Sequence, residues 1–150
     1  MVNLQGATEI IRDFLRNNIS DPLSRDTGEW IYDDIPRSDL AKNHFPRIGV
    51  VAVRSDKQAS AIGTPKRYEI ASVDIIIKTA FSQKIDIDGI KKDYEIVSYL
   101  ANEIDEAIKN NQAHFRTNGL IEVMPIYENP TSDERRNPTY QIGIRIKYIK

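Results

Sequence analysis

The sequence contains no cysteine, so neither a disulfide framework nor a thiolate metal site can hold this fold together. Only two histidines occur, His44 and His114, and they lack the spacing of a metal-binding pair. No run approaches the ~20 apolar residues of a membrane-spanning helix, and the first residues lack the basic segment and apolar run of a secretory signal. We therefore expect a protein of the cytoplasm, with no metal and no membrane partner.

No charge of one sign dominates the chain. Lysine and arginine number 21, aspartate and glutamate number 22, and the formal net charge is −1. Because tight binding to nucleic acids comes mostly from neutralised phosphates, this balance argues against such binding. The seven tyrosines and the single tryptophan are scattered, as core or cross-strand packing would place them.

Motifs for nucleophilic catalysis and nucleotide binding are also missing. The chain has no G-x-S-x-G elbow, no G-x-x-x-x-G-K-[ST] loop and no G-x-G-x-x-G turn. The adjacent carboxylates Asp33 and Asp34 are typical of a solvated turn. We expect no enzymatic activity and no cofactor. Since general acid–base catalysis can use residues that are unrelated in sequence, a small enzyme or ligand-binding α+β domain stays as an alternative.

One segment comes close to a calcium-binding motif. Residues 84–95 place Asp86, Asp88 and Glu95 at positions three, five and twelve of an EF-hand loop. Lys84 occupies the first ligand position, where its ammonium group would repel the ion. We expect no calcium site here. Instead, Asp86 or Asp88 is predicted to cap the following helix, where a carboxylate satisfies free amide groups.

What the sequence does contain is the periodicity of a globular α+β domain. Its 150 residues, 40% hydrophobic and 29% charged, suit one domain spanning residues 1–150. Apolar residues at helical spacing predict a first helix over residues 8–17 and a second over residues 89–110. The predicted buried stripes are Ala7, Ile10, Ile11, Phe14 and Leu15 in the first helix, and Ile90, Tyr94, Val97, Leu100, Ala101, Ile104 and Ile108 in the second.

Four segments have the pattern of strands. Residues 47–54 are an apolar run that indicates a well-buried strand. Residues 67–79 and 139–149 alternate apolar and polar side chains at period two, and residues 120–127 complete the set. At about 3.3 Å per residue, the two alternating strands would be about as long as a compact domain is wide, so they must bend or project. Residues 29–32 are either a short strand or a tucked aromatic anchor.

The predicted order of elements is α-β-β-α-β-β. Two hairpins, each beside a helix, most simply form a mainly antiparallel sheet with the helices packed on one face, which is an α+β fold. Two polar segments, residues 55–66 and 128–138, are predicted to be loops between strands. We expect them to be mobile in the free subunit and ordered by contacts in an assembly.

These loops and the projecting strands form the predicted protein interface. Ile70 and Ile76 lie on the strand face opposite to the alternating core residues. They need a partner or a second covering layer, unless they are scattered surface apolar residues. The charged loop residues are the other candidates. The predicted interface consists of Lys57, Lys66, Arg67, Ile70, Ile76, Asp133, Glu134, Arg135 and Arg136.

Taken together, these features resemble the tail-terminator (tail-completion) proteins of tailed bacteriophages. The resemblance covers nearly the whole chain and rests first on its size and the order of its elements. Three further features support it: the I-x-x-F-L pattern at residues 11–15, the segment YEIASVDIIIKTA at residues 68–80, and a final strand that alternates to its end.

The resemblance implies a structural protein of the virion head–tail junction, assembled in the host cytoplasm. Such a protein forms a ring, typically hexameric, that caps the completed tail-tube protein and presents a docking surface to the head–tail connector protein, with DNA only as a passing cargo. A closed ring needs heterologous contacts, which exposed strand edges can offer. The family has no catalytic residues to carry over. Another neck or head-closure subunit of the same particle stays as an alternative.

Overall fold

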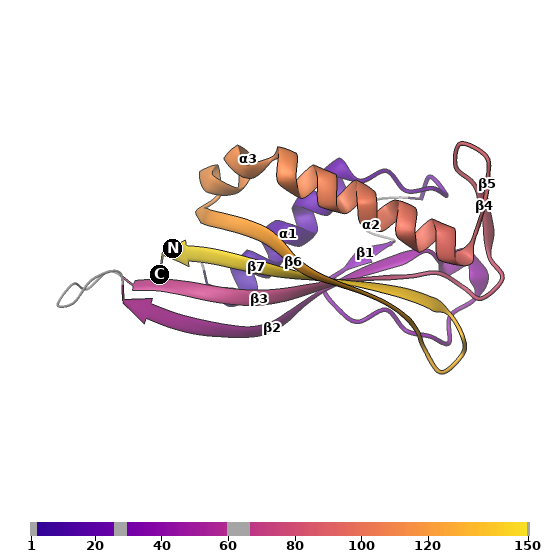
Figure 1. The fold of residues 1–150 in the computed structure, drawn as a ribbon, viewed down its shortest axis with the longest axis horizontal. Coiled ribbons are helices and arrows are strands. Elements are labelled where there is room, and N and C mark those ends of the chain that lie inside the picture. The colour runs from indigo at the N-terminus through magenta and orange to yellow at the C-terminus, as the bar shows by residue number, and fades with distance from the viewer. Residues whose placement is uncertain (1–2, 26–29, 60–66, 150) are drawn as a thin grey trace.

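The computed structural model describes residues 3–25, 30–59 and 67–149. Helices and strands alternate irregularly along these ranges (Figure 1). In chain order the elements are α1 (Leu4–Asn18), β1 (Ile31–Tyr32), the 3-10 helix η2 (Lys42–His44), β2 (Arg47–Ala59), β3 (Arg67–Lys78), β4 (Lys84–Asp86), β5 (Ile90–Lys92), α2 (Asp93–Asn110), α3 (Gln112–Thr117), β6 (Leu120–Ser132) and β7 (Pro138–Ile149).

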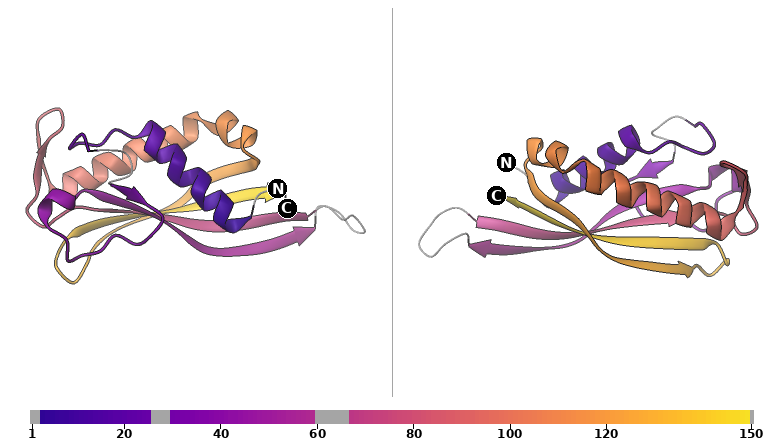
Figure 2. Two further views of the ribbon diagram at one scale, coloured as in Figure 1. Left: turned by 180° about the vertical axis from the view of Figure 1, so that it is seen from behind. Right: turned by 45° about the horizontal axis from the view of Figure 1, so that its top comes forward.

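Five strands form one twisted sheet in the order β1-β2-β3-β7-β6, and β4 pairs with β5 in a separate hairpin. Neighbours in the sheet are antiparallel except β1 and β2, which are parallel. The helices α1, α2 and α3 lie on one face of the sheet (Figures 1 and 2). The predicted α+β class is therefore confirmed. The order differs from α-β-β-α-β-β because β1, the β4–β5 hairpin and α3 are too short to show a period in the sequence.

The helix α1 begins about one turn earlier than predicted. The Asn3 side chain accepts a hydrogen bond from the Gly6 backbone N–H at 2.7 Å, which caps the helix at its true start. The predicted apolar stripe is buried except for Ile10, which is half-buried against the core.

The helix α2 begins at Asp93 rather than at residue 89, so the predicted cap is wrong. Asp86 accepts a hydrogen bond from a backbone N–H within the turn of the β4–β5 hairpin, and Asp88 adopts a positive φ of 51° in that turn. Glu95 serves the start of α2 instead, because its side chain accepts a hydrogen bond from the N–H of the residue before the helix at 3.2 Å. Pairing between the two short strands displaces the helix start.

The buried stripe of α2 differs from the predicted one only at its first turn. Ile90 and Tyr94 are exposed, and Ile96 is buried in their place. The rest of the stripe is buried as predicted, and it consists of Val97, Leu100, Ala101, Ile104 and Ile108.

The alternating strands β3 and β7 form the floor of the core, as predicted. Their inward side chains face the helices and are fully buried, because every second residue of a strand points to the same face. This floor consists of Ala71, Val73, Ile75 and Ile77 from β3, and Ile142, Ile144, Ile146 and Tyr148 from β7.

Both predicted polar loops are strand in part. β2 extends to Ala59, so residues 55–59 are strand, and residues 60–66 lie outside the described part of the chain. β6 extends to Ser132, which leaves only residues 133–137 as the turn to β7. In both polar stretches the backbone pairs with the other strand of its hairpin, whatever the side-chain pattern.

The strands β2 and β6 each carry a β-bulge at the same level of the sheet. The register shifts between Ala52 and Arg54 in β2 and between Pro125 and Tyr127 in β6, and Ala52 and Pro125 are aligned through β3 and β7. Bulges increase the local right-handed twist, and the sheet twists strongly in its middle (Figure 1). The long strands therefore bend around the core. The predicted burial of residues 47–54 holds only for the first half of the segment: Ile48 and Val50 are buried, whereas residues 52–54 around the bulge are exposed.

Residues 30–32 satisfy both interpretations of the segment that contains them. Ile31 and Tyr32 form the short strand β1, which pairs with Ile48 and Gly49. The Trp30 side chain is only 1% exposed and belongs to the core. Glu29 lies outside the described residues.

Candidate protein-interaction surfaces

Within the described ranges, no group of three or more His, Cys, Asp or Glu side chains is placed to hold a metal ion. No described helix combines the length and apolarity needed to cross a membrane. His44 is exposed in η2. The ring of His114 packs against Phe14, with 5.5 Å between centroids. The candidate sites that the structure offers are a sheet face, a groove, a turn and a hairpin.

The predicted interface residues do not form one surface. Lys57 and Arg67 lie on β2 and β3 at the end of the sheet that leads to residues 60–66, and Lys66 lies outside the described residues. Residues 133–136 lie in the β6–β7 turn at the opposite end of the sheet (Figure 1). The sequence did not show this separation, because it depends on the opposite directions of the two hairpins.

Asp133 organises the β6–β7 turn from within. Its Oδ2 accepts a hydrogen bond from Lys78 Nζ at 2.9 Å, in an ion pair whose two side chains are each 8% exposed. Its Oδ1 accepts hydrogen bonds from the N–H groups of Arg135 (2.8 Å) and Asn137 (3.0 Å). Burial acts to raise the pKa of Asp133, but these hydrogen bonds outweigh it, so the pKa is lowered.

The same turn is also bound to two other segments. The Asn137 side chain accepts a hydrogen bond from the Phe81 N–H at 2.9 Å and donates one to the Ser38 carbonyl at 3.1 Å. Glu134 accepts a hydrogen bond from the Ser38 hydroxyl. Residues 133–137 are therefore a short hydrogen-bonded turn instead of the long polar loop predicted. Arg135 and Arg136 are its exposed cations.

A polar cluster lies on the face of the sheet opposite the helices. Asp74 in β3 accepts hydrogen bonds from the Tyr127 hydroxyl and from the Gln141 amide, both at 2.6 Å. The hydrogen bond to Asp74, with a smaller effect of burial, raises the pKa of Tyr127. The tyrosine ring covers Gly143, where an added Cβ would lie 1.9 Å from it. Our sequence interpretation missed this cluster because its members come from three different strands.

Apolar side chains surround that cluster on the outer face. Ile70 and Ile76, both predicted to need cover, are half-buried there. The segment after β1 covers one end of this face, since an added Cβ at Gly49 would lie 2.0 Å from the Asp34 carbonyl oxygen. Exposed apolar residues remain on β2 and β6, and they are Val53, Met124, Ile126 and Tyr127.

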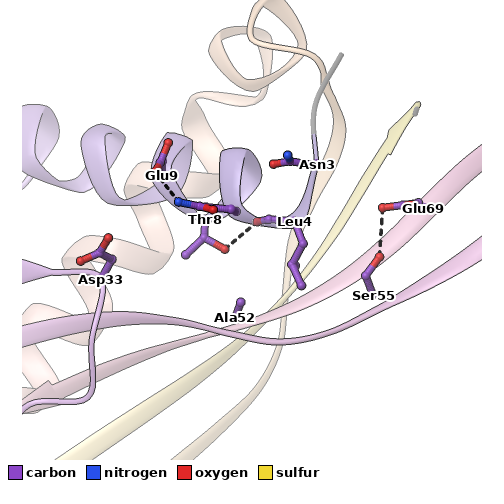
Figure 3. A pocket seen from close by; sticks show the side chains of 9 residues that line it. Asn3, Leu4, Thr8, Glu9, Asp33, Ala52, Ser55 and Glu69 are labelled. Carbon is purple, nitrogen blue, oxygen red and sulfur yellow. Dashed lines mark hydrogen bonds between the residues drawn. The ribbon is translucent and has the colours of Figure 1, made fainter.

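A groove of about 600 Å³ lies between the first turns of α1 and the strand β2 (Figure 3). The Leu4 side chain points from α1 toward Ala52 on β2, and these two residues give the groove an apolar floor. Glu9, Asp33 and Glu69 bring carboxylates to its walls. The groove therefore combines an apolar floor with an acidic rim, in which Asp33 is already ion-paired with Arg12 at 3.1 Å.

The deepest carboxylate of this groove is part of a buried network. Glu69 is 3% exposed and accepts hydrogen bonds from the Ser55 hydroxyl at 3.0 Å and the Tyr148 hydroxyl at 2.5 Å. Burial, followed by the hydrogen bond to Glu69, raises the pKa of Tyr148 to about 12. This network fixes one wall of the groove.

The β4–β5 hairpin projects from the other end of the molecule (Figures 1 and 2). Ile85 is buried on its inner side. In the register, Lys84 is opposite Lys92 and Asp86 is opposite Ile90, so these four residues share the outer side. Ile90 is 75% exposed, the highest value among the exposed large apolar residues of the described chain.

No protein-family model matches this chain, and a search of curated proteins gives no match.

Proposed function

We propose that this chain is a structural virion subunit that assembles into a ring, and that the ring caps a phage tail tube and joins it to the head–tail connector. The observation that supports this function best is the sheet face opposite the helices. Val53, Met124, Ile126 and Tyr127 are exposed there on β2 and β6. Val53, Ile126 and Tyr127 line one hollow of this face. Exposed apolar side chains that gather on one face mark protein interaction sites, and a ring subunit needs such sites for its tube and its connector.

The two ends of the subunit also differ in shape and chemistry. One end holds the acidic groove between α1 and β2, and the other holds the projecting hairpin and the β6–β7 turn. A subunit with unlike ends forms heterologous contacts, which close into a ring when the rotation per subunit is suitable. The hexameric number is the one that the family resemblance implies. A formal net charge of −1 suits a channel through which DNA passes without being held.

Negative-stain microscopy of cognate tail tubes tests this function. Tubes assembled with the protein should end in a ring and stop growing, whereas tubes assembled alone should continue. A variant with Val53→Asp and Ile126→Asp, which places charge on the outer face, should lose capping. A matched variant with Glu106→Lys on the exposed side of α2 should keep it.

Two results would count against the proposal. Tubes that grow unchanged beside a folded, purified protein would show that it is not a terminator. Binding to the connector without binding to the tube would assign it to another neck or head-closure position of the particle.

A further inference from the structure

We propose that the β4–β5 hairpin of one copy docks into the groove between α1 and β2 of the next copy. The occupant of the groove is therefore a second copy of this chain. The inference deepens the proposed ring-forming function and rests on it for the closure of the ring.

The hairpin has two unfavourable features on its outer side, which also carries Asp86. Ile90 is 75% exposed on its outer side, although a side chain of this size gains about 1.5–3 kcal/mol from full burial. Lys84 and Lys92 lie directly opposite each other, and like charges at such positions destabilise a strand pair. Neither lysine forms an ion pair with another described residue. A partner with an apolar floor and carboxylates would compensate both features.

The groove supplies these groups in a matching arrangement. On one strand, side chains two residues apart point the same way and are separated by about 7 Å, so Ile90 and Lys92 can enter one groove together. Ile90 would meet the apolar floor at Ala52, and Lys92 would reach the acidic rim that includes Glu9. The volume of about 600 Å³ accommodates side chains of this size.

The backbone beside the groove is available as well. β1 pairs with β2 only at Ile48 and Gly49, so from Val50 onward β2 is an edge strand among the described strands. The strand β5 is likewise an edge of its two-stranded sheet. An extended strand added to an open sheet edge gains main-chain hydrogen bonds, while alternate side chains enter neighbouring pockets. Docking of β5 along β2 would therefore form main-chain hydrogen bonds at the open edge of β2 and place side chains in the groove.

The placement of the two surfaces determines the symmetry of the contact. The hairpin follows the end of β3, whereas the groove lies toward the start of β3, beside Glu69. They are at opposite ends of the sheet (Figure 1), so a subunit cannot fill its own groove. The contact is heterologous and leads from each subunit to the next.

Disulfide trapping tests the contact, because the chain has no cysteine of its own. In the variant with Ala52→Cys and Ile90→Cys, the two thiols of one chain are at opposite ends and cannot pair with each other. Mild oxidation of the full-length protein should give a ladder of covalent oligomers on a non-reducing gel. A control variant with Ala52→Cys and Ser98→Cys, which moves one thiol to the exposed side of α2, should stay largely monomeric.

Single-cysteine variants make the test specific. A mixture of Ala52→Cys and Ile90→Cys chains should give covalent dimers at least 10-fold faster than either variant alone, and no larger species. Equal rates for the mixture and the separate variants, or a ladder no stronger than that of the Ser98 control, would overturn the proposed contact.

The outcomes separate this contact from the function on which it rests. Capped tubes without the disulfide ladder would refute the hairpin-in-groove contact and leave the terminator function standing. A ladder from a protein that never caps tubes would support the contact and refute the terminator function. The variant Ala52→Trp, which fills the groove, should stay folded by circular dichroism and lose the capping of tubes.

Discussion

Replacing Asp133 by asparagine should lower the free energy of unfolding by about 3–5 kcal/mol, the range for breaking a buried ion pair by removing one partner. The substitution keeps the side-chain shape and one acceptor oxygen. It removes the charge that faces Lys78 Nζ at 2.9 Å, and both side chains are only 8% exposed. The lysine is then left as a buried cation without its counter-ion.

A double-mutant cycle isolates this ion pair. In a Lys78→Met background Asp133 is itself a buried charge without its counter-ion. Removing that charge offsets the weakened hydrogen bonds to the backbone N–H groups, so Asp133→Asn should cost less than about 1 kcal/mol. Urea denaturation followed by circular dichroism gives each change in unfolding free energy from the shift of the urea midpoint, provided that the dependence of the free energy on urea concentration is unchanged. The exposed neighbour Glu134→Gln should change stability by less than about 0.5 kcal/mol. Equal costs of Asp133→Asn in both backgrounds would refute the reasoning.

The same ion pair predicts a pH dependence. Because the pKa of Asp133 is lowered in the folded state, its stabilisation is present above the unfolded pKa of about 3.9 and is lost as the pH falls through the folded pKa. The difference in stability between the wild type and Asp133→Asn should therefore shrink as the pH falls below about 4. A constant difference from pH 7 downward would show that the carboxylate charge is not the cause.

Three further substitutions or titrations test the core and the sheet. Leu100→Ala should cost about 2–5 kcal/mol in urea denaturation and the exposed Ser98→Ala less than about 0.5, and similar costs would contradict the buried face assigned to α2. Gly49→Ala should lower the melting temperature more than Gly143→Ala. At Gly49 the new Cβ would lie 2.0 Å from a backbone oxygen, which cannot move easily, and at Gly143 it would lie 1.9 Å from a tyrosine ring, which can move. A larger loss for Gly143→Ala would contradict this reason. The Tyr148 phenol should ionise at about pH 12 in an ultraviolet titration. Its contribution to stability should be complete below the unfolded pKa of about 10 and lost as the pH rises through about 12. If Tyr148→Phe removed a phenol transition near pH 10 instead, this assignment would be wrong.

The parts of the fold with a long apolar period could be predicted from the sequence. The stripe of α1 and the inward side chains of β3 and β7 are buried as the periods of 3.6 and two require. The errors occur where a short sequence pattern is compatible with either a helix or a strand. Ile90 lies at helical spacing from the α2 stripe, but pairing of β4 with β5 holds it in a strand and exposes it. A three-residue strand is too short to show its own period.

The candidate surfaces depend on long-range contacts that no local pattern reports. Asp74 and Tyr127 are separated by 53 residues in the chain, yet their side chains are hydrogen-bonded on the outer face. Asp133 was predicted as an interface residue because of its charge and its polar surroundings. Its burial beside Lys78 follows from the length of the β6–β7 hairpin, which brings the turn to the end of β3.

The network around Asp133 also determines how well the hairpin is positioned for docking. The turn between β3 and β4 is held by several hydrogen bonds to other segments. Among them, the Phe81 N–H donates to the Asn137 side chain at 2.9 Å, and the Ser82 N–H donates to the Asp93 side chain at 2.9 Å. Because Asp133 in turn fixes Asn137, the base of the β4–β5 hairpin depends on it. A preorganised surface loses less conformational entropy on association than a loose one. Asp133→Asn, introduced into the disulfide-trapping variant, should therefore slow the formation of the covalent ladder even in conditions where the protein stays folded. An unchanged rate would show that the network stabilises only its own turn.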